Sequence, residues 1–283
     1  MSYSIIVEAG ATKSDWVIVD SQANRLKQFK GRGINVSAMR MEEVKAVLSE
    51  SLESECVDLD VKGIYLYVAG VVTDSIRKEV ISHVRSVSSI SEIEVNDDLM
   101  GAARSVCGKQ PGIVAILGTG SNACSYDGTS VTRNVYSGGY ILGDEGSAAT
   151  LGKMFLADFI KGLVPSEVAD DFAKEYDASY AAIVEGVYRS PSPSGYLGSL
   201  APFIVKHKAN PYIENLIRQN FLSFVERTLS KYDVDALPVG FVGGFAFACS
   251  DMLPPILKER GIRITRFLKS PIDGLIDYHS GCC

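Results

Sequence analysis

The sequence lacks the features that mark membrane, secreted or nucleic-acid-binding proteins. It contains no apolar run of 18 residues, so we expect no membrane span. Its first residues, MSYSIIVE, have no basic segment and already include an acid, which is not typical of a signal peptide. Lysine and arginine form no basic run and the formal charge is −6, which argues against a general nucleic-acid binder.

Zinc-ligand spacing and the common nucleotide-binding motifs are also missing. The six cysteines form no CxxC pair, so we expect reduced thiols and a cytoplasmic protein; the sequence assigns no particular role to the adjacent cysteines Cys282 and Cys283. Neither a GxxxxGK[ST] loop nor a GxGxxG segment that opens a helix after the first strand is present. With 283 residues, the chain has the length of about two domains.

Apolar periodicity predicts an α/β pattern that starts twice. The first pattern has strands at Ser4–Gly10, Asp15–Asp20, Arg25–Gly33, Gly63–Gly70 and Glu92–Asp97, with helices at Met41–Ser54 and from about residue 73. The second begins with a strand at Gly112–Leu117, has a helical insertion at about 147–231, and ends with strands at Val239–Gly243 and Ile262–Phe267. We therefore predict two domains, residues 1–111 and 112–283, with a duplicated fold.

Each predicted domain opens with a hairpin whose tip suits phosphate binding. The first tip is Glu8-Ala-Gly-Ala-Thr-Lys-Ser-Asp15, in which Thr12 and Lys13 have groups that donate to phosphate oxygens. A carboxylate at Glu8 suits Mg²⁺ bound through water. The second tip, Gly118-Thr-Gly-Ser-Asn122, offers backbone donors and two hydroxyls. A plain hairpin with a polar turn would have the same composition, so each tip alone is a weak signal.

Three further segments combine glycine or carboxylates with strand ends. The segment Val239–Ala246 has paired glycines that suit either a flat ring on bare backbone or close packing of a helix. Asp97 and Asp98 follow a strand, where one is expected to cap the next helix and the other to act as a general base. The acidic pair in Gly143-Asp-Glu-Gly-Ser147 suits either ligand hydroxyls or the start of a helix.

In this order, the five segments resemble the acetate and sugar kinase, Hsc70 and actin superfamily. Within it, the chain resembles the branch that contains the N-acetylglucosamine kinases and the BadF/BadG/BcrA/BcrD ATPases, and GTGSN followed by GDEGS carries most of this resemblance. It covers nearly the whole chain. It implies two actin-like (ribonuclease H-like) domains, each a mixed sheet with helices on both faces, with ATP and sugar in the cleft between them.

The resemblance also implies roles for individual residues. Asp98 matches the catalytic carboxylate that accepts the proton of the sugar 6-hydroxyl, and Asn35 matches a sugar-contacting asparagine of the small domain. Gly10, Thr12 and Lys13 match the first phosphate loop, with Glu8 near the magnesium ion. In the second domain, the implied phosphate- or adenosine-binding residues are Gly118, Thr119, Gly120, Gly243 and Gly244. The implied sugar-binding residues are Thr119, Gly120, Asn122, Asp144 and Glu145.

The first loop departs from the family pattern, which has an aspartate and three glycines. Here it reads Glu8-Ala-Gly-Ala, and the two alanines narrow the room for a phosphate. Ala69 stands where such kinases carry a sugar-contacting serine, which puts the identity of the sugar in doubt. The cysteine-rich zinc motif of ROK kinases is missing.

The resulting expectation is an ATP- and Mg²⁺-dependent kinase of an amino sugar, with N-acetylglucosamine favoured and a homodimer as the commonest state of such an enzyme. No nucleic-acid or membrane partner is expected. Two alternatives stay open. One is a BadF-type ATPase that activates a partner dehydratase, and the other is a non-catalytic sensor of sugar or nucleotide.

Overall fold

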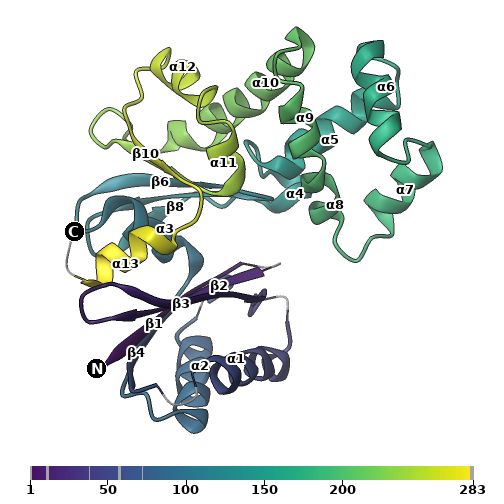
Figure 1. Cartoon of the computed structure of the whole chain (residues 1–283). Coiled ribbons are helices and arrows are strands. Elements are labelled where there is room, and N and C mark those ends of the chain that lie inside the picture. The colour runs from purple at the N-terminus through teal and green to yellow at the C-terminus, as the bar shows by residue number, and fades with distance from the viewer. Residues whose placement is uncertain (1, 11–12, 38, 57–58, 72, 281–283) are drawn as a thin grey trace. The chain divides into compact units, whose positions relative to one another are not determined.

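The chain folds into two compact α/β units, each built around a five-stranded sheet (Figure 1). The structure is a computed structural model that describes residues 2–10, 13–37, 39–56, 59–71 and 73–280. The first unit holds residues up to 110 together with 127–131 and the C-terminal segment from 271, and the second holds residues 111–126 and 132–270. The predicted α/β class with two actin-like sheets is confirmed.

The first sheet has the strand order β3-β2-β1-β4-β5. Strands β1–β3 form an antiparallel meander, and β4 and β5 pair in parallel, as the sequence predicted. The elements of this unit are β1 (Tyr3–Ala9), β2 (Lys13–Asp20), β3 (Arg25–Arg32), α1 (Met41–Glu55), β4 (Val61–Val68), α2 (Asp74–Val87), β5 (Glu92–Asn96), α3 (Asp98–Cys107) and α13 (Ile272–Ser280).

Helices cover both faces of the first sheet, because alternate strand residues are apolar on each face. Helices α1 and α2 pack on the face that carries Ile5, Val7 and Trp16 (Figure 1). Helices α3 and α13 pack on the opposite face, where α13 inserts Ile272 and Leu275 into the core. Strands β1, β4 and β5 run parallel to one another. Their carboxyl ends therefore meet at one edge of the sheet, where polar groups from different strands come together.

The C-terminal helix departs from the predicted domains. Helix α13 belongs to the first unit, whereas the sequence placed all of 112–283 in the second domain. The physical reason is close packing, since a Cβ on Gly274 would lie 2.2 Å from the carbonyl oxygen of Ser105 in α3. Glycine at this position lets the two helices approach each other.

The second sheet has the strand order β10-β9-β6-β7-β8. Its core packs the inward face of β6 and β9 against helices that include α5 and α10. The elements of this unit are β6 (Gly112–Leu117), β7 (Ser121–Tyr126), β8 (Val131–Asn134), α4 (Gly139–Leu142), α5 (Ala148–Phe159), α6 (Ser166–Glu175), α7 (Tyr180–Tyr188), α8 (Pro193–Ser199), α9 (Ala201–Lys206), α10 (Pro211–Arg227), the 3₁₀ turn η1 (Leu229–Lys231), β9 (Val239–Val242), α11 (Gly244–Ala248), α12 (Leu253–Lys258) and β10 (Ile264–Leu268). In the described part of the chain, no helix is both long and apolar enough to cross a membrane.

Candidate active site

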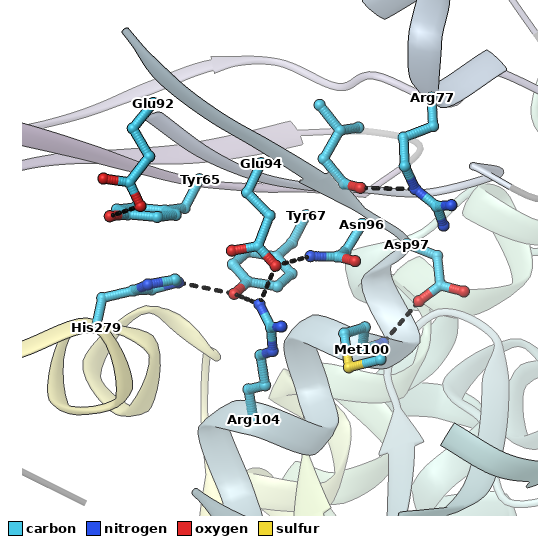
Figure 2. Close-up of polar contacts among 11 residues, drawn as sticks. Tyr65, Tyr67, Arg77, Glu92, Glu94, Asn96, Asp97, Met100, Arg104 and His279 are labelled. Atoms are coloured by element: carbon cyan, nitrogen blue, oxygen red, sulfur yellow. Dashed lines mark hydrogen bonds and ion pairs between the residues drawn. The ribbon is translucent and has the colours of Figure 1, made fainter. Parts of the chain in front are cut away.

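The turn between β5 and α3 places its two aspartates in different environments. Asp97 is the N-cap of α3, and its Oδ1 accepts a 2.7 Å hydrogen bond from the backbone N–H of Met100 (Figure 2). Asp98 is the first helical residue, and its carboxylate accepts hydrogen bonds from its own N–H and that of Leu99. Burial, and then the charge of Asp97, raise the pKa of Asp98 to about 6. At pH 7 this carboxylate is therefore mostly ionised and able to accept a proton.

A second group of charges lies at the end of the β1–β2 hairpin. Glu8 and Asp15 are directly opposite each other in the antiparallel register, and Asp15 is buried. Burial, then the charges of Asp15 and Asp98, raise the pKa of Glu8 to about 7, while Lys13 opposes this shift. The first unit thus brings Glu8, Lys13 and Asp98 together, as the sequence predicted. Thr12 lies outside the described residues, as do Ala11 and the Cys282–Cys283 pair.

Asn35 lies at the same edge of the first sheet. It forms an isolated parallel bridge with Ala69, the residue after β4, and its Oδ1 accepts a hydrogen bond from the backbone of Ser37 at 3.0 Å. The neighbouring N–H of Ile34 donates to the carbonyl oxygen of Gly10 at 3.0 Å. The segment that carries Asn35 is therefore fixed to the first hairpin tip and to the end of β4.

In the second unit, the Gly118–Gly120 loop is attached to the start of α5. The carbonyl oxygens of Gly118 and Thr119 accept hydrogen bonds from the N–H groups of Ala148 and Ala149, at 2.9 and 3.0 Å. A Cβ added to Gly118 would meet no heavy atom within 4 Å. One side of this loop is therefore bare backbone next to open space, which suits a phosphate group.

Asp144 lies directly against this loop. Its Oδ1 accepts a 3.2 Å hydrogen bond from the N–H of Ser121, and a Cβ on Gly120 would come within 3.0 Å of its Oδ2. Asp144 is buried and has a φ of +56°, a conformation that few residues other than glycine adopt. Burial raises the pKa of Asp144, against the effect of the Ser121 hydrogen bond. A strained, buried carboxylate beside a glycine loop is typical of a binding residue.

Glu145 follows Asp144 in the chain, and Asn122 lies on β7. Both side chains already have hydrogen-bond or ion-pair partners. Glu145 forms an ion pair with Arg227, with 2.5 Å between Oε1 and Nε. The amide oxygen of Asn122 accepts hydrogen bonds from the N–H of Ala123 and from Asn134 Nδ2, at 2.9 and 2.8 Å. Any ligand role of these two residues uses their remaining oxygen or nitrogen atoms.

The paired glycines after β9 have two different reasons to be glycine. Gly243 has a φ of +126°, and a Cβ there would lie 2.4 Å from the carbonyl oxygen of Leu117. Gly244 opens α11, and a Cβ there would meet nothing within 4 Å. Close packing and a positive φ therefore explain Gly243, whereas the space beside Gly244 is open and a side chain there would meet no neighbour. The segment lies next to the Gly118 loop, since the same Cβ on Gly243 would be 3.3 Å from Gly118 N.

Sequence reasoning assigned no role to Asn220, although it holds the acidic segment in place. This buried amide of α10 accepts a hydrogen bond from the N–H of Gly146 at 2.9 Å and donates to the carbonyl oxygen of Ser147 at 3.0 Å. The only local signal is a single polar residue on the apolar face of a helix. Asp15 was likewise inside the predicted hairpin tip but received no role.

The comparisons with known proteins agree with this fold. The solved structure of a proposed N-acetylglucosamine kinase from Porphyromonas gingivalis is 35% identical to the chain, covers 98% of both chains and superposes with a TM-score of 0.89. The chain belongs to the N-acetylglucosamine kinase-like family. The sequence-based identification of this branch of the sugar kinase and actin superfamily is thus confirmed.

Two more distant structures agree with the kinase-like fold. A proposed N-acetylglucosamine kinase from Chromobacterium violaceum is 22% identical over 98% of both chains, with a TM-score of 0.75. A ROK family glucokinase from Streptomyces griseus, solved with glucose and AMPPNP, is 15% identical over 98% of this chain and 97% of its own, with a TM-score of 0.56. No family model and no curated protein matches the chain.

Proposed function

We propose that this kinase-like protein transfers the γ-phosphoryl group of ATP to the 6-hydroxyl of an amino sugar, with N-acetylglucosamine as the favoured acceptor. The observation that carries the proposal is the geometry of the β5–α3 turn, where Asp97 caps the helix and Asp98 stays available as a base. The 35% identity to a proposed N-acetylglucosamine kinase supports this choice of sugar.

In the proposed reaction, the first unit supplies the base and part of the phosphate site. Asp98 accepts the proton of the sugar hydroxyl as its oxygen attacks the γ-phosphorus. Lys13, with Gly10 and Thr12, neutralises charge on the phosphates, and Asn35 binds the sugar. Because little covalent chemistry is required of the protein, positioning and charge stabilisation account for most of the catalysis.

The second unit supplies the remaining contacts in this proposal. Gly118, Thr119 and Gly120 bind phosphate through the open side of their loop, and Gly243 and Gly244 lie under the adenosine. Asp144 accepts hydrogen bonds from sugar hydroxyls, together with Thr119, Gly120, Asn122 and Glu145. The buried carboxylate of Asp144 is the strongest of these acceptors, because charged hydrogen bonds contribute more than neutral ones.

The residues around Glu8 fit a magnesium ion bound through water. The described residues contain no group of three side chains placed to hold a metal directly. The carboxylates of Glu8, Asp15 and Asp98 are nevertheless close enough to raise the pKa of Glu8, and a cation nearby would relieve this repulsion. Mg²⁺ with several waters suits such a site, with the nucleotide phosphates as its main ligands. When bound, it would neutralise charge on the transferring group.

The test is ADP release with MgATP and a panel of N-acetylglucosamine, N-acetylmannosamine, glucosamine, glucose and no sugar. We expect release that depends on an amino sugar and that falls at least ~10²-fold in Asp98→Asn. The matched control is Asp97→Asn, because asparagine is an equally good N-cap and leaves the base in place; its turnover should stay within a few-fold of wild type.

Other outcomes would contradict the proposal in distinct ways. Release without sugar would indicate an activator ATPase, and sugar binding without any ADP would indicate a sensor. Near-normal turnover in Asp98→Asn would remove this residue from the mechanism.

A further inference from the structure

A polar cluster lies on the α3/α13 face of the first sheet and includes none of the predicted site residues (Figure 2). Its centre is Arg104 of α3, whose side chain is 13% exposed. Nη1 of Arg104 donates to Glu94 Oε1 on β5 at 2.7 Å and to the hydroxyl of Tyr67 on β4 at 2.8 Å. That hydroxyl lies 2.8 Å from Nε2 of His279 on α13. The cluster therefore joins four elements, α3, β5, β4 and α13, around the side chain of Arg104.

One carboxylate oxygen in this cluster holds both sides of the β5–α3 turn. Oε1 of Glu94 accepts hydrogen bonds from Asn96 Nδ2 at 2.8 Å and from Arg104 Nη1 at 2.7 Å. Asn96 ends β5, Arg104 is in the last turn of α3, and Asp98 lies between them in the chain. Although burial opposes it, these two hydrogen bonds hold the pKa of Glu94 below its usual value, so it is ionised at neutral pH.

The other contacts of α3 hold it against its neighbours at both ends, since its last turn also packs closely on α13 at Ser105 and Gly274. Nε of Arg77 on α2 donates to the carbonyl oxygen of Val95 at 2.9 Å, and Asp97 caps the helix. A Cβ on Gly101 would lie 2.9 Å from Cβ of Tyr67, so α3 lies tightly against β4 near its start. The Glu94–Arg104 pair differs from these contacts because it links α3 directly to β5, across the turn that carries Asp98. Loss of the pair would relax this turn and move Asp98, the first residue of α3.

We propose that Glu94 is a positioning residue for Asp98, acting through the hydrogen bonds that one of its oxygens accepts from Asn96 and Arg104. Glu94 does not contact the reacting groups itself. Its carboxylate fixes the direction in which Asp98 faces the attacking hydroxyl. A displacement of about 1 Å in such a group can cost about 10²-fold in rate. The inference rests on the proposed role of Asp98 as base.

The test compares three substitutions of Glu94 with a matched control in the same unit. Glu94→Ala removes both hydrogen bonds, and we expect kcat to fall by about 10- to 100-fold while the KM values for ATP and sugar stay within about twofold. Glu94→Gln keeps an oxygen acceptor at the same reach and should recover most of kcat. The control is Glu79→Ala, which breaks the 2.8 Å ion pair of Glu79 with Lys45 between α2 and α1 and should leave kcat unchanged.

A shortened side chain keeps the test decisive if the alanine variant does not fold. Glu94→Asp retains the charge but cannot reach both Asn96 and Arg104, so kcat should fall by about 3- to 10-fold in a protein with wild-type circular dichroism. A folded Glu94→Ala or Glu94→Asp with wild-type kcat would overturn the inference. A rise in KM as large as the fall in kcat, in the Glu94 variants, would also overturn the inference, because it would indicate a role in binding.

The failure of this inference is distinguishable from failure of the proposed function. If wild type releases ADP in response to sugar and Asp98→Asn does not, the proposed function stands whatever the Glu94 variants do. If Asp98→Asn keeps wild-type turnover, the proposed function fails before Glu94 is considered.

Discussion

At the scale of single residues, carboxylates in the two units have different environments and therefore different uses. Asp98 has a pKa of about 6, raised by burial and by Asp97, which leaves it ionised yet basic enough to take a proton at pH 7. Asp144 is also buried, but it accepts a hydrogen bond from the Ser121 N–H at the edge of a glycine loop. Since Asp98 also accepts backbone hydrogen bonds, the difference lies in position: Asp98 begins α3 at the end of β5, whereas Asp144 lies against the glycine loop, where we propose that it orients a ligand.

Asp144→Asn tests this difference. Asparagine keeps an oxygen that accepts from Ser121, so the fold should be retained, but the charge that strengthens hydrogen bonds to sugar hydroxyls is lost. A hydrogen bond to a charged group contributes about 1.5–3 kcal/mol, so KM for the sugar should rise by about 10- to 100-fold with a much smaller change in KM for ATP. Steady-state kinetics with each substrate varied in turn would measure this. An unchanged sugar KM would place the sugar elsewhere.

At the scale of elements, local patterns predicted most strands and the larger helices within one or two residues. The strand at Gly112–Leu117 has the predicted bounds, and the predicted helix at Met41–Ser54 extends over Met41–Glu55. Helix α13 received no prediction: Ile272, Leu275 and Ile276 have helical spacing, but nine residues are fewer than the window over which this period is informative. Its packing on the first sheet depends on contacts far apart in sequence, which periodicity cannot reveal.

The candidate site shows the same limit. The residue pattern alone left the roles of Asp97 and Asp98 open, and the family resemblance selected Asp98 as the base; the hydrogen bond from Met100 makes Asp97 the helix cap. Glu94 carries no local signal at all, because its importance comes from Arg104 and Asn96 meeting at one oxygen. Motifs predicted the loops that we propose to bind ligands, whereas the groups that hold these loops in place are defined only by tertiary contacts.

Gly118, in the second loop, and the neighbouring Gly243 form a matched pair of substitution sites. Gly118→Ala adds a methyl group to open space, so stability should change by less than about 0.5 kcal/mol, while KM for ATP should rise by about tenfold, or about 1.4 kcal/mol. Gly243→Ala adds a methyl group 2.4 Å from the Leu117 carbonyl at a positive φ, so stability should fall by about 1–3 kcal/mol. Thermal melts and ATP titrations of both variants separate the two effects. Equal melting temperatures for the pair would contradict the packing role of Gly243.

At the scale of the whole molecule, the chain leaves the first unit near residue 110, returns to it briefly at residues 127–131, and returns again from residue 271. The returning helix is held by packing and by His279, whose ring stacks on Tyr65 with 3.7 Å between centroids. The Tyr67 hydroxyl accepts a hydrogen bond from Arg104 and lies 2.8 Å from His279 Nε2, and burial keeps this imidazole neutral at pH 7 by lowering its pKa. The packing of α13 on the first sheet therefore includes a histidine that is uncharged at neutral pH.

This uncharged state predicts that acid weakens the first unit through His279. Burial lowers the pKa of His279 to about 4, with Glu94 opposing and Arg104 reinforcing the shift. A histidine with a depressed folded-state pKa stabilises the fold above its unfolded pKa of about 6.5, and this contribution is lost as pH falls towards 4. At 1.36 kcal/mol per pKa unit, and since the ring is only partly buried, the loss should be no more than about 3 kcal/mol.

The comparison is wild type against His279→Gln, which removes the titrating group. Trp16, the only tryptophan, is fully buried in the first unit, so its fluorescence during urea unfolding reports on that unit. Glu8 and Asp98 titrate in both proteins, and their contribution cancels in the difference. We expect the free energy of unfolding of wild type to fall more than that of the variant between pH 7 and pH 4.5, even if the glutamine variant is the less stable protein at pH 8. Parallel curves across this range would show that His279 does not link acid to the C-terminal helix.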